Sequence, residues 1–294
     1  MNDTALHIIV IAATFFLAGA VAILLAGLNP AWKDTVRGLW SAYRLEFAIV
    51  GAILIPAAIG GWLFFAVLLL ICWRGQYELF AHFGVKGLGL VQLGAMALGG
   101  LLVIAGALDR IEPSGATVLA LVLGVMSAFM QFARSRLGLA AFLGLLLPAW
   151  CVAMMAELQV SQGFIWILLV YATVEMNDAF AYVGGKLFGR TKILPRLSPN
   201  KTLEGLIAGM VVGGGSGFLI GHELLKLSAA SALSIALVAL VAGLVGDMLT
   251  SLLKRWQQKK DFPALMVLHG GVLDIYDSLL IATPIVFLTR ALLI

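Results

Sequence analysis

The sequence has 294 residues, of which 62% are hydrophobic and 12% are charged, and its formal net charge is +4. A mean hydropathy of +1.06 excludes an ordinary soluble domain. The two cysteines, Cys72 and Cys151, both lie in apolar runs, which favours buried thiols and offers no support for a disulfide scaffold.

Nearly all of the chain divides into apolar runs of membrane-spanning length. The first run is too long, and too weakly preceded by positive charge, for a cleaved signal peptide, so we predict that it is a retained span. Pro56 and the pair Gly60–Gly61 predict a break between the second and third runs. The predicted spans are approximately 6–28, 46–59, 61–73, 88–108, 115–133, 138–156, 163–184, 203–222, 228–252 and 278–294.

The distribution of basic residues predicts the orientation of these spans. All lysines and arginines except Arg110, Lys226 and Arg290 follow odd-numbered spans, and basic loops face the cytoplasm. This alternation requires that 46–73 crosses the membrane twice. We therefore predict an all-α polytopic transmembrane helix bundle of about nine or ten spans, with ten favoured and both termini outside. Nine spans, with 46–73 as one tilted helix or a re-entrant pair, is the alternative.

The first of two unusual polar segments begins with Glu175 and Asp178 at the end of an apolar run. Their spacing of three residues places both on one face of a helix. Further along, Ser198 or Thr202 can cap the next helix, and a helix N-terminus beside Lys201 suits a phosphate. A basic loop with an ordinary helix cap is the alternative interpretation.

The second polar segment begins with Asp247, which lies inside the apolar run 233–253. A buried carboxylate requires a cation, a proton or a partner, and an ion pair with Lys254 is the simplest alternative. Asp274 and Asp277 stand three residues apart, so on one helix they would share a face. Together with Asp247 they could form a magnesium site, because magnesium prefers carboxylate oxygens.

Basic residues and glycines complete this segment. Lys254, Arg255 and Lys260 could neutralise phosphates beside a metal, and the sequence His269–Gly270–Gly271 could approach a ligand closely. A zinc site is not favoured, since the sequence has four histidines and no Cys/His cluster. Acids for a metal and bases for phosphates beside apolar helices indicate phosphoryl or nucleotidyl transfer to a lipid.

Two separate motifs resemble those of the phosphatidate cytidylyltransferases (CDP-diacylglycerol synthases). The C-terminal signature of that family is matched by Ser251, Lys254, Arg255, Lys260, Asp261, His269, Gly270, Gly271, Asp274, Asp277 and Ser278, with Gly246–Asp247 just upstream. Its other motif is matched by Asn177, Asp178, Tyr182, Gly185, Gly189, Ser198, Pro199, Lys201, Thr202, Glu204 and Gly205. The resemblance is strong over about 175–284 and mainly hydropathic before that.

The resemblance implies a magnesium-dependent nucleotidyltransferase of phospholipid biosynthesis. It would join CTP and phosphatidic acid into CDP-diacylglycerol and release pyrophosphate. Asp247 and Asp274 would bind Mg²⁺, with Asp178 and Asp277 as further ligands and a second cation nearby. The implied catalytic residues are Asp247, Lys254, Arg255, Lys260, Asp261 and Asp274. The implied substrate-binding residues are Asn177, Asp178, Ser198, Lys201, Thr202, Glu204, Ser251, His269, Gly270, Gly271 and Asp277.

The implied organisation is a single integral membrane domain over 1–294. N-terminal helices over 1–160 resemble the family loosely, and 170–284 forms the catalytic region. The protein would lie in a bacterial inner membrane with its active site on the cytoplasmic side. Its partners would be its two substrates and membrane lipid, with no nucleic acid, and a homodimer is left open.

Three departures from the signature favour an alternative. Val267–Leu268 replace a Pro-Gly pair, Phe262–Pro263 replace a small residue, and Ile275 replaces an arginine. If that arginine binds phosphate, its loss removes a charge-assisted contact of about 1.5–3 kcal/mol. The alternative is a catalytically weak or inactive paralogue that acts on another lipid phosphate or binds lipid. A transporter is disfavoured, because the polar residues gather at one membrane face rather than near the midplane.

Overall fold

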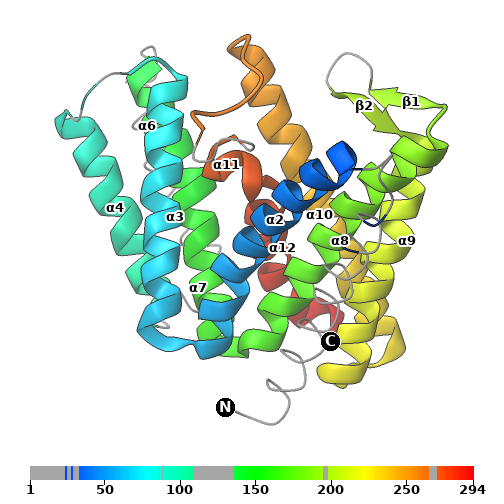
Figure 1. Cartoon of the computed structure of the whole chain (residues 1–294). Coiled ribbons are helices and arrows are strands. Elements are labelled where there is room, and N and C mark those ends of the chain that lie inside the picture. Colours follow the sequence, from blue (N-terminus) through cyan, green and yellow to red (C-terminus); the bar gives the residue numbers. More distant parts are fainter. Residues whose placement is uncertain are drawn as a thin grey trace. The chain divides into compact units, whose positions relative to one another are not determined.

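The structure is a computed structural model that describes residues 33–85, 87, 89–108, 136–194, 198–264 and 270–294, together with Leu24 and Leu28. These residues are mostly helical (Figure 1). The chain divides into two compact units, residues 1–67 and 68–294. The predicted span 115–133 and almost all of the predicted span 6–28 lie outside the described residues, so the count of ten spans and the orientation stay predictions.

The first unit contains α2 (Lys33–Ile59) and the start of α3 (Gly61–His82). The predicted break is confirmed at the glycine pair, where Gly60 and Gly61 have φ angles of 74° and 59°. Glycine suits this left-handed turn because it has no Cβ. Pro56, in contrast, lies within α2 and does not end it. The backbone N–H of Gly60 donates to the Pro56 carbonyl at 2.7 Å and closes the last turn.

The second unit continues α3 and contains the other helices and strands of the described residues. Its helices are α4 (Leu90–Ala107), α6 (Arg136–Gly144), the π-helical η2 (Leu145–Trp150), α7 (Cys151–Gln162), α8 (Phe164–Phe188), α9 (Leu203–Leu219), η3 (Ile220–Leu224), α10 (Ala229–Trp256), α11 (Val272–Ile275) and α12 (Asp277–Leu293). Cys72 and Cys151 are buried free thiols, as the sequence predicts.

Six helices among the described residues are long and apolar enough to cross a membrane. They are Gly61–His82, Leu90–Ala107, Arg136–Gln162, Phe164–Phe188, Leu203–Leu224 and Ala229–Trp256. The shorter apolar stretch Phe47–Ile59 corresponds to another predicted span. The predicted fold class, a polytopic helical membrane protein, is confirmed.

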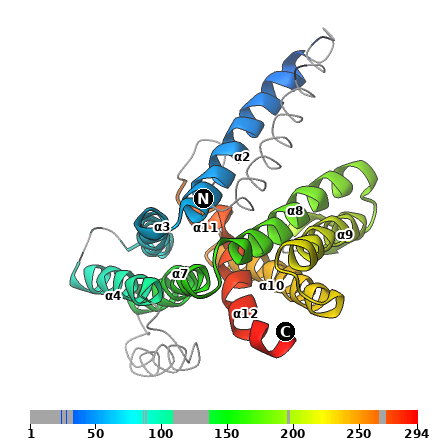
Figure 2. The same cartoon turned by 90° about the horizontal axis from the view of Figure 1, so that it is seen from below.

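Close packing of α8 against α9 positions one side of the candidate site. Figure 2 shows α8, α9, α10 and α12 grouped together, with α4 beside α7. Buried glycines at every fourth position line the α9 face at this contact: Gly205, Gly209, Gly213 and Gly217. A Cβ on Gly209 would approach the Asn177 backbone oxygen to 2.5 Å, so these glycines let the two backbones come together.

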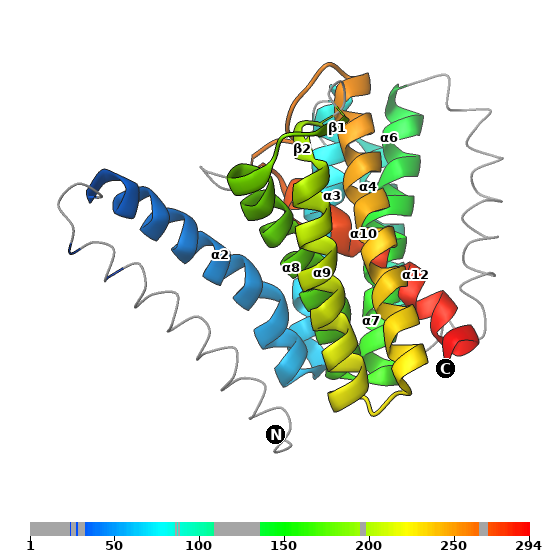
Figure 3. The same cartoon turned by 90° about the vertical axis from the view of Figure 1, so that its right-hand side faces the viewer.

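A short hairpin links α8 to α9, in a segment that the sequence did not predict to contain strands. β1 (Lys192–Leu194) pairs antiparallel with β2 (Ser198–Thr202), with Lys192 opposite Thr202. Thr202 is the N-cap of α9, and its Oγ1 accepts from the Gly205 N–H at 3.1 Å. Of the two predicted caps, Thr202 is therefore confirmed and Ser198 is not. Figure 3 shows the hairpin at the same end of the molecule as the last turn of α10.

Candidate functional site

Asp247 lies on α10 and receives partners from two directions. Its Oδ2 accepts from the Lys201 ammonium on β2, and its Oδ1 accepts from the Ser251 hydroxyl one turn later at 3.3 Å. The side chains of Asp247 and Lys201 keep 26% and 33% of their surface exposed. Lys201 therefore lies at the predicted site, where it forms a partly exposed ion pair with Asp247.

Lys254 pairs with Asp274 rather than with Asp247, so the simple alternative drawn from the sequence is wrong. The Lys254 Nζ donates to Asp274 Oδ1 at 2.7 Å, and both side chains are nearly buried. Asp274 Oδ2 accepts from the backbone N–H groups of Phe262 and Gly271 at 2.7 and 2.9 Å. Asp274 therefore organises the chain between α10 and α11 and has little capacity left for another ligand.

The predicted shared helical face of Asp274 and Asp277 is also corrected. The helix stops after Ile275, and Tyr276 has φ −117° and ψ 16°, so Asp277 begins a separate helix, α12. Asp277 is buried, and its Oδ2 accepts from the Thr250 hydroxyl on α10 at 2.8 Å. Burial, and to a smaller extent the charge of Glu175, raises the pKa of Tyr276, so its phenol stays protonated at this bend.

Three carboxylates from α8, α10 and α12 interact with one another. Asp178 and Asp277 each lie within electrostatic range of Asp247. Asn177, buried on α8, donates its side-chain amide to Asp178 at 3.0 Å. Asp274 does not share in this mutual interaction, since its carboxylate faces Lys254 and two backbone N–H groups.

The donor chemistry of this cluster fits a divalent cation. Among the described residues, Lys201 is the one cation in an ion pair with these three carboxylates, so carboxylate oxygens remain for a cation that prefers them. Within the described parts of the chain, no three Asp, Glu, His or Cys side chains already converge closely enough to hold a metal ion alone. Magnesium usually retains waters and substrate phosphates as ligands, so a partial protein set suits it.

The remaining predicted residues are more dispersed. The Glu204 carboxylate accepts from the backbone N–H groups of Arg190 and Thr191 at 3.0 and 3.2 Å, which ties the turn before β1 to α9. Arg255, Lys260 and Asp261 are exposed at the end of α10 and just beyond it. His269 and the Val267–Leu268 departure lie outside the described residues.

Glu78 and Arg74 on α3 belong to the site region, although the sequence did not predict a place for them there. Glu78 is fully buried and accepts from the Val272 and Leu273 N–H groups at 2.8 and 3.0 Å, so it caps the N-terminus of α11. Arg74 donates its Nε to Glu78 at 2.7 Å and its Nη2 to the Pro263 carbonyl at 2.9 Å. The available signal was an arginine and a glutamate four residues apart directly after the predicted span 61–73, a spacing that places both on one helical face.

Phe262, one of the departures from the family signature, packs over the buried ion pair. Its ring centroid lies 5.7 Å from the Lys254 ammonium and 4.7 Å from the centroid of the His82 ring. An aromatic face over the ammonium, together with the near-burial of both side chains, favours the Lys254–Asp274 ion pair. Phe262, although it departs from the signature, is therefore packed between His82 and the Lys254–Asp274 pair.

A sequence model of the cytidylyltransferase family matches residues 40–293. The chain belongs to the cytidylyltransferase family. The matched range includes every element of the carboxylate cluster, Glu78, which caps α11, and its partner Arg74. The predicted family membership is confirmed, and the helices described above identify this member of the family as an integral membrane protein.

Three relatives illustrate the similarity. The uncharacterized protein YnbB of Escherichia coli K12 is 37% identical over 139 residues, 47% of this chain and 46% of that protein. A phosphatidate cytidylyltransferase of Chlamydia muridarum is 38% identical over 131 residues, 42% and 43% of the two chains. The phosphatidate cytidylyltransferase of Aquifex aeolicus is 28% identical over 170 residues, which are 57% of this chain and 63% of that protein. The chain thus spans about half the length of the relatives it matches.

Proposed function

We propose that this cytidylyltransferase joins CTP to phosphatidic acid, forming CDP-diacylglycerol and pyrophosphate. The observation that carries the proposal is the cluster of Asp178, Asp247 and Asp277, from three helices, with Lys201 as its cation. Relatives named phosphatidate cytidylyltransferases support this choice of substrates.

In the proposed reaction, a phosphate oxygen of phosphatidic acid attacks the α-phosphorus of CTP. A new P–O bond forms as the bond from that phosphorus to the bridging oxygen of the β-phosphate breaks, and pyrophosphate leaves with the electron pair. Both reactants are anions, so catalysis depends on positive charge and on holding them in line. Lys201, Arg255 and Lys260 are the cations that could reach phosphates, whereas Lys254 is held by Asp274.

We propose Asp247 as the principal magnesium ligand, with Asp178 and Asp277 as further ligands of this ion or of a second cation. Bound Mg²⁺ would neutralise the triphosphate and stabilise the charge that develops on pyrophosphate. Thr250 fixes the Asp277 carboxylate, and Asn177 orients that of Asp178. In this proposal Lys201 leaves Asp247 for a phosphate when the cation binds.

We further propose a bacterial inner membrane as the location, with the site facing the cytoplasm. Lys201 on β2 reaches Asp247 from the hairpin, and the hairpin lies at the same end of the molecule as the last turn of α10 (Figure 3). At that depth phosphatidic acid could enter sideways from the bilayer while CTP arrives from water. The basic residues of this end also fit the rule that cytoplasmic loops carry lysine and arginine.

The decisive experiment measures CDP-diacylglycerol formation by the purified, reconstituted protein with CTP, phosphatidic acid and Mg²⁺. We expect product with the native chain and with Glu223→Gln, which alters an exposed carboxylate on η3, outside the cluster. We expect none with Asp247→Asn or without divalent cation. Absence of product from a folded native preparation would reject the proposal.

Ile275 favours a second candidate, a weak or inactive paralogue that acts on another lipid phosphate or only binds lipid. Ile275 is partly buried at the end of α11, where the resembling family has an arginine. If a phosphate contact was lost there, Ile275→Arg should raise turnover with phosphatidic acid about tenfold. An unchanged rate, together with product from a different nucleotide or lipid phosphate in the same assay, would favour the second candidate.

A further inference from the structure

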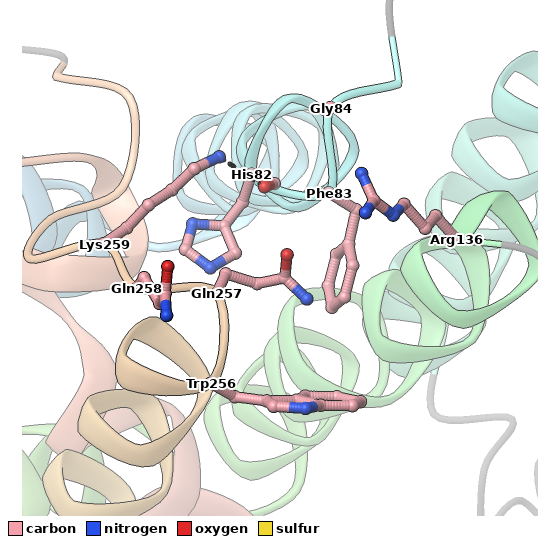
Figure 4. A pocket seen from close by; sticks show the side chains of 8 residues that line it. All are labelled: His82, Phe83, Gly84, Arg136, Trp256, Gln257, Gln258 and Lys259. Atoms are coloured by element: carbon pink, nitrogen blue, oxygen red, sulfur yellow. Dashed lines mark hydrogen bonds between the residues drawn. The ribbon is translucent and has the colours of Figure 1, made fainter.

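A polar pocket lies beside the candidate site and contains none of its predicted residues. It has a volume of about 370 Å³ and is formed by three helix ends, as Figure 4 shows. The end of α3 and the turn after it supply His82, Phe83 and Gly84, and the start of α6 supplies Arg136. The end of α10 and the turn after it supply residues 256–259.

The lining combines positive charge with unused hydrogen-bond donors. Arg136 and Lys259 are its cations, and no carboxylate lines it within the described parts of the chain. The Lys259 ammonium is fixed by the His82 carbonyl at 2.5 Å. The Arg136 guanidinium and the Gln257 and Gln258 carboxamides make no side-chain hydrogen bond or ion pair with any described residue. Such a set of donors suits a phosphate anion.

The backbone at Gln258 adds an independent indication. Gln258 has φ 54°, and its N–H donates to the Arg255 carbonyl while that of Lys259 donates to the Lys254 carbonyl, both at 2.9 Å. This is the glycine-type ending of a helix, in which a residue with a Cβ is strained. A glutamine at this position is explained if its side chain is needed in the pocket, since strained residues concentrate at binding sites.

The position of the pocket restricts what can enter it. Three candidate membrane spans end there, Gly61–His82, Arg136–Gln162 and Ala229–Trp256. The Trp256 ring is exposed and meets Phe83 edge to face at 6.3 Å. Tryptophan at the end of a span is typical of lipid headgroup depth. The pocket therefore offers hydrogen-bond donors that could bind a phosphate, beside an aromatic wall at the membrane surface.

We propose that this pocket binds a phosphate group at the membrane surface, separately from the site of nucleotidyl transfer. Arg136 is the main contact, with the Gln258 carboxamide and Lys259 assisting, and Phe83 and Trp256 form the wall on the bilayer side. The phosphate can belong to an anionic lipid headgroup or be a free phosphate ion. The chemistry is the same, and the two sources differ in whether acyl chains contribute to binding.

The test uses the full chain in detergent and quenching of tryptophan fluorescence by brominated phosphatidylglycerol, with brominated phosphatidylcholine in parallel. Arg136→Gln should raise the half-quenching concentration of phosphatidylglycerol about tenfold. Lys192→Gln, which removes an exposed cation from β1 at the same end of the molecule, should change it less than about twofold. Trp256→Phe should remove part of the quenching and thereby locate the lipid.

A further variant separates binding from folding. Gln258→Gly relieves the strained backbone, so it should keep or raise the thermal midpoint while weakening phosphatidylglycerol binding about threefold. Competition by millimolar inorganic phosphate would identify free phosphate as a ligand, and persistence of binding in that phosphate would identify the headgroup. Equal effects of Arg136→Gln and Lys192→Gln, or equal quenching by the two lipids, would overturn the proposal.

Discussion

The carboxylate of Glu78 lies where a Cβ on Gly271 would have to sit. A Cβ built on Gly271 would collide with Glu78 Oε2. It would also lie only 2.4 Å from the Cδ and 2.8 Å from the Oε1 of the same carboxylate. Glu78 cannot easily move, because it is fully buried and holds Arg74 and the first N–H groups of α11. Two segments almost two hundred residues apart in sequence are thereby fitted together, and this fit places Asp274 opposite Lys254.

Gly271→Ala should therefore destabilise the protein, although its backbone, at φ −76° and ψ 177°, is open to any residue. The added methyl overpacks a rigid contact, at an expected cost of about 1–3 kcal/mol. Denaturation in mixed micelles would measure this cost. Gly94→Ala is the matched control, since a Cβ there meets nothing within 4 Å, and it should keep or raise the stability. Equal stability of the two variants would contradict the steric account.

Arg74 and Glu78 should be energetically coupled. Glu78→Gln removes the charge that pairs with Arg74 and leaves only one oxygen for the α11 N–H groups, so we expect a loss of about 3 kcal/mol. Arg74→Gln leaves the buried carboxylate without its cation. In a double-mutant cycle on unfolding, the double variant should lose about 1–2 kcal/mol less than the sum of the single losses. Additive losses would show that the pair is not a unit.

The Thr250 hydroxyl should contribute to both the stability and the turnover of the protein. Its hydroxyl lies 2.8 Å from the buried Asp277 carboxylate, so Thr250→Val keeps the shape but removes that donor. We expect a loss of about 1–2 kcal/mol in stability and a reduced turnover. Thr283→Val is the control, because that buried hydroxyl bonds only to the Leu279 carbonyl of its own helix. A similar loss in both variants would assign the effect to helix geometry rather than to Asp277.

Lys201 and a divalent cation should compete for Asp247. Lys201→Met removes the ammonium from that carboxylate, so Mg²⁺ alone, without nucleotide, should bind several-fold more tightly. The shift of the thermal midpoint with Mg²⁺ concentration measures this affinity without any turnover. Asp247→Asn should abolish the shift. A Lys201→Met protein whose midpoint responds to Mg²⁺ as the native one does would argue against Asp247 as the ligand.

Hydropathy and local turn chemistry predicted much of the fold. The helices around 163–184, 203–222 and 228–252, the turn at Gly60–Gly61 and the Thr202 cap all depend on residues close together in sequence. The hairpin over 192–202 was missed, because its strands have only three and five residues, β2 contains Pro199, and neither strand shows the alternating pattern of a half-buried strand. The bend at Tyr276 was also missed, since no glycine or proline marks it.

The sequence by itself determined that this is a helical membrane protein of the cytidylyltransferase kind, because apolar periodicity and motif spacing are local properties. Only the tertiary structure decided which lysine meets which aspartate: Lys201 with Asp247, and Lys254 with Asp274. It also brought Glu78 to α11 across 194 residues of chain. Such pairings depend on where packed helices place their ends, and side chains 46 or 194 residues apart leave no signal in local spacing.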